Sequence, residues 1–129
     1  MAKIKSIKHN NQAVKAVRKY LEQVQGEYEI VGSYNYDNNL DLFDLVALND
    51  GDLVFIQVRR YDGYSPHEVP RKKIGEKKRA RMEAGMYRWL GWNDEYLDIP
   101  VRIDIIDLFV MDAADRALIR HYINAEKEC

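Results

Sequence analysis

The feature that most constrains the fold is a pair of apolar, β-branched-rich runs separated by a short polar stretch. The runs span residues 40–48 and 53–60, and Asn49-Asp50-Gly51-Asp52 lies between them. An Asp-Gly pair between such runs favours a tight turn whose central residues have positive φ angles. The sequence therefore predicts a β-hairpin over residues 40–60.

Helical periodicity predicts one helix on each side of this hairpin in the chain. Apolar residues at spacings of three and four predict a helix over residues 9–25, followed by Gly26 as a stop signal. A similar spacing predicts a second helix over residues 71–90, with a basic opposite face. The apolar residues concerned are Ala13, Val17, Tyr20, Leu21 and Val24 in the first helix, and Ile74, Met82, Met86, Trp89 and Leu90 in the second.

The remaining segments complete an α/β pattern. Residues 28–34 and 101–111 are expected to be strands, and residues 61–70 a loop. Residues 116–123 fit a short helix or an edge strand. The order α-β-β-β-α-β predicts a sandwich in which helices flank a mixed sheet. At 129 residues the chain is expected to form a single domain over residues 1–129, with its core at about 10–110.

Three polar residues of the predicted hairpin carry its chemistry. Side chains alternate along a strand, so Gln57 and Arg59 share one face, and Asp44 lies on the preceding strand. In an antiparallel hairpin these residues are expected to meet at one end of the sheet. The pattern is an Asp, a twelve-residue gap, and then Gln-x-Arg.

This pattern resembles the PD-(D/E)XK nuclease superfamily and, more narrowly, the YraN-type family of small endonuclease-like proteins. That family shows G-E-I-D-L-I-A, then F-V-E-V-K/R-x-R, then a basic helix ending in Y/W-L, then R-F-D-V-I. The corresponding segments here are Asp41-Leu42-Phe43-Asp44-Leu45-Val46-Ala47, Phe55-Ile56-Gln57-Val58-Arg59-Arg60, Trp89-Leu90 and Arg102-Ile103-Asp104-Ile105-Ile106. The resemblance implies a restriction-endonuclease-like three-layer sandwich.

The resemblance also implies a metal-dependent nuclease site. In the superfamily an Asp and a Glu bind one or two Mg²⁺ ions, and a Lys helps to activate the attacking water. Carried over by position, Asp44 and Gln57 become the metal ligands, and Arg59 takes the place of the Lys; all three become the candidate catalytic residues. The implied cofactor is Mg²⁺ or Mn²⁺, because hard oxygen ligands suit these ions.

Several positions depart from the family pattern. Gln57 offers a neutral oxygen in place of a carboxylate, and Arg59 cannot accept a proton. Leu42 stands where the family has an acid, and no acid occurs in residues 10–20. These departures predict a degenerate nuclease site with one carboxylate ligand, Asp44.

The charge distribution indicates a polyanionic partner. Residues 59–88 hold ten Lys and Arg against four Asp and Glu, a formal charge of +6, whereas the whole chain has a net charge of −1. The candidate nucleic-acid contacts in this segment are Arg59, Arg60, Arg71, Lys72, Lys73, Lys77 and Lys78. The alternative is that this helix is merely a solvated, mixed-charge surface.

Three functions stay open from the sequence. The first is nucleic-acid binding by a degenerate nuclease, with structured or branched DNA as a candidate ligand. The second is an active Mg²⁺-dependent endonuclease of the Holliday-junction-resolvase kind. The third is a protein-interaction scaffold, with an apolar surface near Trp92, Tyr96 and Leu97. A homodimer is compatible with all three.

Composition excludes several other classes. Cys129 is the only cysteine, so neither an internal disulfide nor a cysteine-based zinc site can form. No apolar run reaches the roughly 20 residues of a membrane span, and no signal peptide is recognisable at the N-terminus. We therefore expect no membrane partner and a cytoplasmic location.

Overall fold

The computed structural model describes residues 7–25, 27–33, 43–71, 74–111 and 116–125, with only the backbone described at 7–11, 24, 25 and 116. The helices are α1 (Ile7–Lys19), which continues as a π-helical segment over Tyr20–Gln25, and α2 (Glu76–Trp92), with 3-10 turns at Pro66–Glu68 and Asp94–Tyr96. The strands are β1 (Glu29–Ser33), β2 (Leu45–Asn49), β3 (Asp52–Asp62), β4 (Val101–Met111) and β5 (Arg116–Tyr122).

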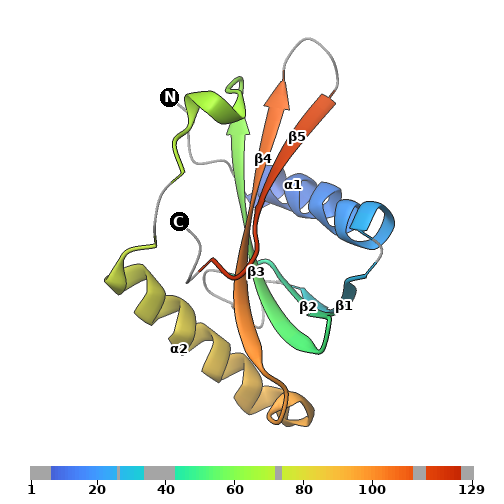
Figure 1. The fold of residues 1–129 in the computed structure, drawn as a ribbon, viewed down its shortest axis with the longest axis vertical. Coiled ribbons are helices and arrows are strands. Elements are labelled where there is room, and N and C mark those ends of the chain that lie inside the picture. The colour runs from blue at the N-terminus through green and yellow to red at the C-terminus, as the bar shows by residue number, and fades with distance from the viewer. Residues whose placement is uncertain (1–6, 26, 34–42, 72–73, 112–115, 126–129) are drawn as a thin grey trace.

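The strands form one mixed sheet in the order β1-β2-β3-β4-β5 (Figure 1). All neighbouring pairs are antiparallel except β3 and β4, which are parallel. Parallel neighbours need a crossover connection, and α2 lies in the segment that joins them. The chain is thus an α/β protein with a mixed sheet, as the sequence predicts.

The predicted hairpin between β2 and β3 is confirmed. Asn49 pairs with Asp52, and the two residues between them, Asp50 and Gly51, have φ angles of 51° and 82°. Positive φ at both central residues is the geometry that an Asp-Gly turn favours, because it matches the twist of the paired strands. The turn therefore sets the register of both strands.

Each face of the sheet is covered by one helix, as Figure 1 shows. Leu45, Val54 and Ile56 belong to a core cluster that includes the apolar stripe of α1. Side chains of the opposite parity, such as Val46 and Phe55, belong to a second cluster with α2. Strand alternation produces this division. Residues at odd positions of β3 and β4 therefore lie on the α2 face.

The structure corrects one predicted boundary, the start of α2, and decides the type of one segment that the sequence left open, residues 116–122. Helix α2 begins at Glu76 and not at residue 71, because Gly75 is extended (φ −71°, ψ 161°) at the N-cap. Arg71 precedes the helix, and its guanidinium lies 4.8 Å from the centre of the Tyr122 ring. Residues 116–122 form the edge strand β5, not a helix.

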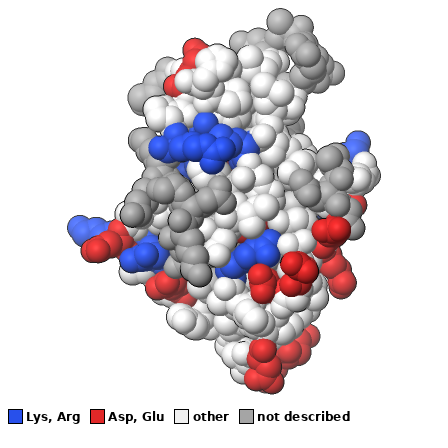
Figure 2. Space-filling model, in the orientation of Figure 1, with Lys and Arg blue, Asp and Glu red and all other residues white. Residues whose placement is uncertain are grey.

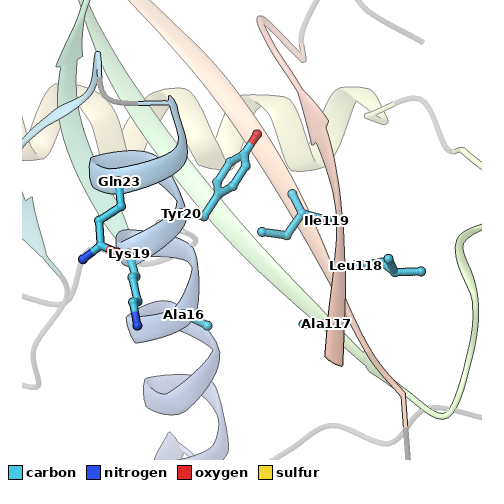
Figure 3. A pocket seen from close by; sticks show the side chains of 7 residues that line it. All are labelled: Ala16, Lys19, Tyr20, Gln23, Ala117, Leu118 and Ile119. Atoms are coloured by element: carbon cyan, nitrogen blue, oxygen red, sulfur yellow. The ribbon is translucent and has the colours of Figure 1, made fainter. Parts of the chain in front are cut away.

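A shallow apolar groove of about 400 Å³ lies between α1 and β5. In Figure 3, Tyr20 points from the helix toward the strand, and Ile119 points from the strand toward the helix. None of the predicted site residues lines this groove. It is therefore separate from the predicted site on β3.

The packing of β1 against α2 depends on the absence of a side chain at Gly32. A Cβ there would lie 3.1 Å from Cζ2 of Trp89. Trp89 is itself held edge-on against Phe55 and stacked on Tyr96. Since the indole has little room to move, Gly32 sets how closely β1 approaches the helix.

Replacing Gly32 is therefore expected to destabilise the fold through overpacking. Gly32→Ala should lower the free energy of unfolding by about 1–3 kcal/mol. The control is Gly91→Ala in α2, where an added Cβ meets nothing within 4 Å. That change should raise the free energy of unfolding by about 0.5–1 kcal/mol, because alanine favours helix. Urea unfolding measures both, and a Gly32→Ala variant as stable as wild type would contradict the packing argument.

Candidate functional site

Asp44 lies directly before β2, beside the backbone of β3. Its backbone N–H donates to the Ile56 carbonyl at 2.8 Å, and its Oδ2 accepts a hydrogen bond from the Val58 N–H at 2.8 Å. Burial raises the pKa of Asp44 to about 6, although the Val58 hydrogen bond favours the charged form. The hairpin register thus brings the carboxylate next to the Gln-x-Arg segment.

Gln57 lies on the α2 face of β3, in one row with Ile105 and Tyr122. Its amide oxygen Oε1 is buried and has no hydrogen-bond partner among the residues that the structure describes. The hydroxyl oxygen of Tyr122 is likewise buried and has no hydrogen-bond partner among the described residues. Buried polar atoms without partners are uncommon in proteins, so this row holds hydrogen-bonding capacity that the described side chains do not use.

The donor set does not fit a firmly held Mg²⁺ or Mn²⁺ ion. These ions prefer several charged oxygen ligands, whereas Asp44 supplies one carboxylate and Gln57 a neutral oxygen. Within the described ranges, no group of three or more His, Cys, Asp or Glu side chains could hold a metal. The family positions 41 and 42 lie outside the described residues.

Arg59 is part of a charged row that crosses three strands. It pairs with Asp107 on β4, which pairs with Arg120 on β5. Arg59 donates from Nε at 2.6 Å and from Nη2 at 3.1 Å to the two carboxylate oxygens. Arg120 donates from Nη2 at 3.0 Å and from Nε at 3.3 Å. The Asp107 side chain is fully buried, and the two guanidinium groups compensate its charge and supply hydrogen bonds to both of its oxygens.

Arg120 also fixes the loop that follows β3. Its Nη1 donates to the carbonyl oxygens of Pro66 and Val69, at 2.9 and 2.8 Å. Arg120 therefore has a structural role. Neither it nor Asp107 is among the residues predicted from the sequence. The signal for Asp107 was an acid in the apolar run 101–111, in phase with Ile103 and Ile105 on the α2 face.

Cations gather around Tyr122 at this end of the sheet. The guanidinium carbons of Arg71, Arg59 and Arg120 lie 4.8, 5.5 and 5.5 Å from the centre of its ring. Such distances allow cation–π attraction, which favours holding positive charge over the ring. Figure 2 shows Lys and Arg side chains gathered in a cluster over the strands on the face seen there.

Lys78, in the first turn of α2, adds a further positive charge. It is half-buried, and the structure gives it no hydrogen bond or ion pair among the described residues. Burial lowers the pKa of Lys78, and the charge of the neighbouring Arg59 lowers it further. Arg59 and Arg120 place two positive charges on the single negative charge of Asp107, a local formal charge of +1.

The other predicted nucleic-acid contacts lie in different settings. Arg60 is on the opposite face of β3 and pairs with Asp62 at 2.7 Å. Lys77 is exposed on α2. Lys72 and Lys73 lie outside the described residues. Tyr61, the residue after Arg60 in β3, is stacked on Phe109, with 5.1 Å between the ring centres.

A second buried acid, Asp104, organises the α1 face. It accepts hydrogen bonds from Arg102, from Tyr28 and from the backbone of Asn124, and His121 Nε2 lies 2.8 Å from its Oδ2. Burial favours a higher pKa for Asp104, but the His121 and Arg102 hydrogen bonds outweigh it and hold the pKa below the usual value. The Arg102-Ile103-Asp104 motif therefore has a structural explanation.

Comparison with known proteins places the chain in a family. No family model matches the sequence. A UPF0102 protein from Roseiflexus castenholzii is 36% identical over 85 residues, which cover 66% of this chain and 68% of that protein. The chain belongs to the UPF0102 family. This is the YraN-type family that the four motifs resemble. The relative's name states no activity, so the function has to be argued from the site.

The raised pKa of Asp44 makes stability depend on pH in a defined direction. A carboxyl whose pKa is about 6 in the folded state and near 4 when unfolded destabilises the fold as pH rises from about 4 to 6. Asp44→Asn keeps an acceptor for Val58 and removes the charge. At pH 8 in metal-free buffer, this variant should have a free energy of unfolding about 1–3 kcal/mol above that of wild type. The difference should vanish near pH 4, and a pH-independent difference would contradict the burial of this carboxylate.

The Asp107 row predicts a large loss of stability when its negative charge is removed. Asp107→Asn leaves two guanidinium groups without an anion and should lower the free energy of unfolding by about 3–5 kcal/mol. The control is Asp62→Asn, which breaks the more exposed pair with Arg60 and should cost about 1 kcal/mol or less. Chemical denaturation measures both, and equal losses would refute the central role of Asp107.

Proposed function

We propose that this chain is a nucleic-acid-binding protein of the restriction-endonuclease-like fold whose metal-dependent nuclease site is degenerate. The observation that carries the proposal is the cationic cluster of Arg59, Arg71 and Arg120, which gathers at Tyr122 and the buried carboxylate of Asp107. A site that is poor in carboxylates and concentrates cations favours the phosphate backbone over a metal ion.

The fold assignment rests on three features together. The mixed sheet has a helix on each face, α2 connects the parallel strands β3 and β4, and the chain belongs to UPF0102. These features support the assignment of Asp44, Gln57 and Arg59 to the nuclease-site positions that the motifs predict. Contacts to phosphates position a nucleic acid without reading bases, so the expected ligand is defined by backbone shape, as in structured or branched DNA.

Salt dependence tests this function directly. We expect fluorescently labelled junction, duplex and single-stranded DNA to bind at low salt, and affinity to fall steeply as salt rises. The Arg71→Ala/Lys77→Ala variant should weaken binding to every sequence and reduce the salt slope by about 0.9 for each phosphate that is no longer neutralised. Lys15→Ala, an exposed change on α1, is the control and should leave the slope unchanged. Absence of binding to all three DNAs at low salt would remove the proposal.

An active nuclease is the alternative, with Asp44 and Gln57 as its predicted metal ligands. Cleavage of junction DNA that requires Mg²⁺ or Mn²⁺ and disappears in Asp44→Ala would establish it. Cleavage that survives this change would indicate a contaminating enzyme. We expect no cleavage, because the described oxygen ligands carry a single negative charge.

A protein-binding role is favoured by an apolar surface at the end of α2. Trp92 and Leu97 are 61% and 60% exposed, whereas Tyr96 is half-buried on Trp89. Large exposed side chains of this kind often belong to interaction sites.

None of the described helices combines the length and apolar character needed to span a membrane. The homodimer and the cytoplasmic location stay predictions.

A further inference from the structure

The two edge strands of the sheet differ in how they are protected from pairing with another chain. Strand β1 is short, carries the exposed Glu29, and has a register irregularity between Ile30 and Gly32. Charges, bulges and short strands are the usual means of protecting an edge. Strand β5 pairs with β4 over seven successive residues without an irregularity, and the guanidinium group of Arg120 is bound to Asp107. Of the two described edges, β5 is therefore the less protected.

The free edge of β5 has apolar side chains on both faces of the sheet. Ala117 and Leu118 are exposed, Leu118 by 47%. Ala117 and Ile119 line the groove beside α1, and in Figure 3 Ile119 points toward that helix whereas Leu118 points away from it. Leu118 shares the α2 face with Arg120, because side chains alternate along a strand. A strand that pairs with β5 would therefore cover apolar surface on both faces.

The sequence of β5 is complementary to itself in an antiparallel arrangement. A two-fold axis normal to the sheet keeps each side chain on its own face, so the axis has to pass through a residue and not between two residues. Centred on Ile119, the pairing includes all seven residues and places Leu118 opposite Arg120 of the second copy. Centred on residue 118 or 120, only residues 116–120 or 118–122 pair, and an arginine lies opposite an arginine in both cases. Like charges directly opposite are unfavourable, so Ile119 is the preferred centre.

Arg120 can lie beside a leucine of the second copy without losing its own partners. Its guanidinium group is bound to Asp107 and to the carbonyl oxygens of Pro66 and Val69. The methylene stem of an arginine can cover apolar surface while its head group stays paired. The two-fold axis produces this contact between Leu118 and Arg120 twice.

From these observations we propose that β5 is the interface of a homodimer, in which two copies of the chain pair their β5 strands antiparallel about Ile119. The main-chain N–H and C=O groups of the free edge supply the hydrogen bonds, and Leu118 and Ile119 supply the apolar contacts. Two five-stranded sheets then join into one, with both α2 faces on the same side. This interface is independent of the proposed function, because the pairing of β5 requires no nucleic acid.

Two opposite charge changes at Leu118 test the register. Leu118→Lys places a like charge opposite Arg120 of the second copy at two symmetric positions. It should raise the dissociation constant of the dimer about tenfold or more in analytical ultracentrifugation. Leu118→Glu places an opposite charge at the same positions and should change the dissociation constant less than about threefold. A similar rise for both variants would overturn the register, because loss of the leucine alone acts on both.

Cross-linking locates the two-fold axis. Directly opposite residues of antiparallel strands have Cα atoms about 4.5–5.5 Å apart, a distance that a disulfide can span. In a Cys129→Ser background, Ile119→Cys should therefore form an intermolecular disulfide on mild oxidation. The control is Ala117→Cys on the same face of β5, whose two copies would be about 13 Å apart along the strands and should stay reduced. Equal cross-linking of both variants would contradict pairing about Ile119.

The oligomeric state of the unchanged protein decides between a second copy and another occupant of the edge. We expect the wild-type protein to be a dimer at a concentration of about 100 μM. A monomer at that concentration would overturn the homodimer, and so would binding of an extended segment of a different protein to β5 of a monomer. Circular dichroism checks that each variant folds; Leu118 and Ala117 are exposed, so their replacement leaves the core intact.

Discussion

The structure depends above all on one buried carboxylate, that of Asp107. It lies in the middle of the sheet without solvent contact, and two guanidinium groups from the neighbouring strands compensate its charge. A charge in such a place is unfavourable unless it is paired and hydrogen-bonded, so Arg59 and Arg120 are held where they are. Through Arg120 the same carboxylate also fixes the loop over residues 66–69.

This pairing also decides what the site can do. In the family pattern the position of Arg59 belongs to a lysine beside a metal. Here Asp107 orients Arg59 through two hydrogen bonds, and burial together with the charge of Arg59 lowers the pKa of Lys78. Asp44 is partly desolvated and Gln57 is neutral, which weakens the metal side of the same site. Around Asp107 on the α2 face, two arginines therefore face a single carboxylate.

Strand β4 serves both faces of the sheet with two buried acids of opposite parity. Asp104 points to the α1 face, where it binds Arg102, Tyr28 and His121. Asp107 points to the α2 face, where it binds the two arginines. Each acid forms hydrogen bonds with segments that are distant in the chain. The presence of Asp104 and Asp107 in an otherwise apolar strand therefore has a structural explanation. Asp44 differs from them, because none of its described contacts is with a cation.

The sequence by itself determined the local structure and the positions of the motifs. The Asp50-Gly51 turn, the two amphipathic helices and the strand at 101–111 follow from short-range rules, because turn chemistry and periodicity act over a few residues. The start of α2 was predicted five residues too early, since the effect of Gly75 depends on its conformation. The family also followed from the order of the four motifs. Only the tertiary structure decided the partners: Asp107 meets Arg59 across a parallel pair and Arg120 across an antiparallel one, and no sequence spacing encodes that row. Long-range electrostatic pairing depends on which strands are neighbours, and that is settled only when the whole sheet has formed.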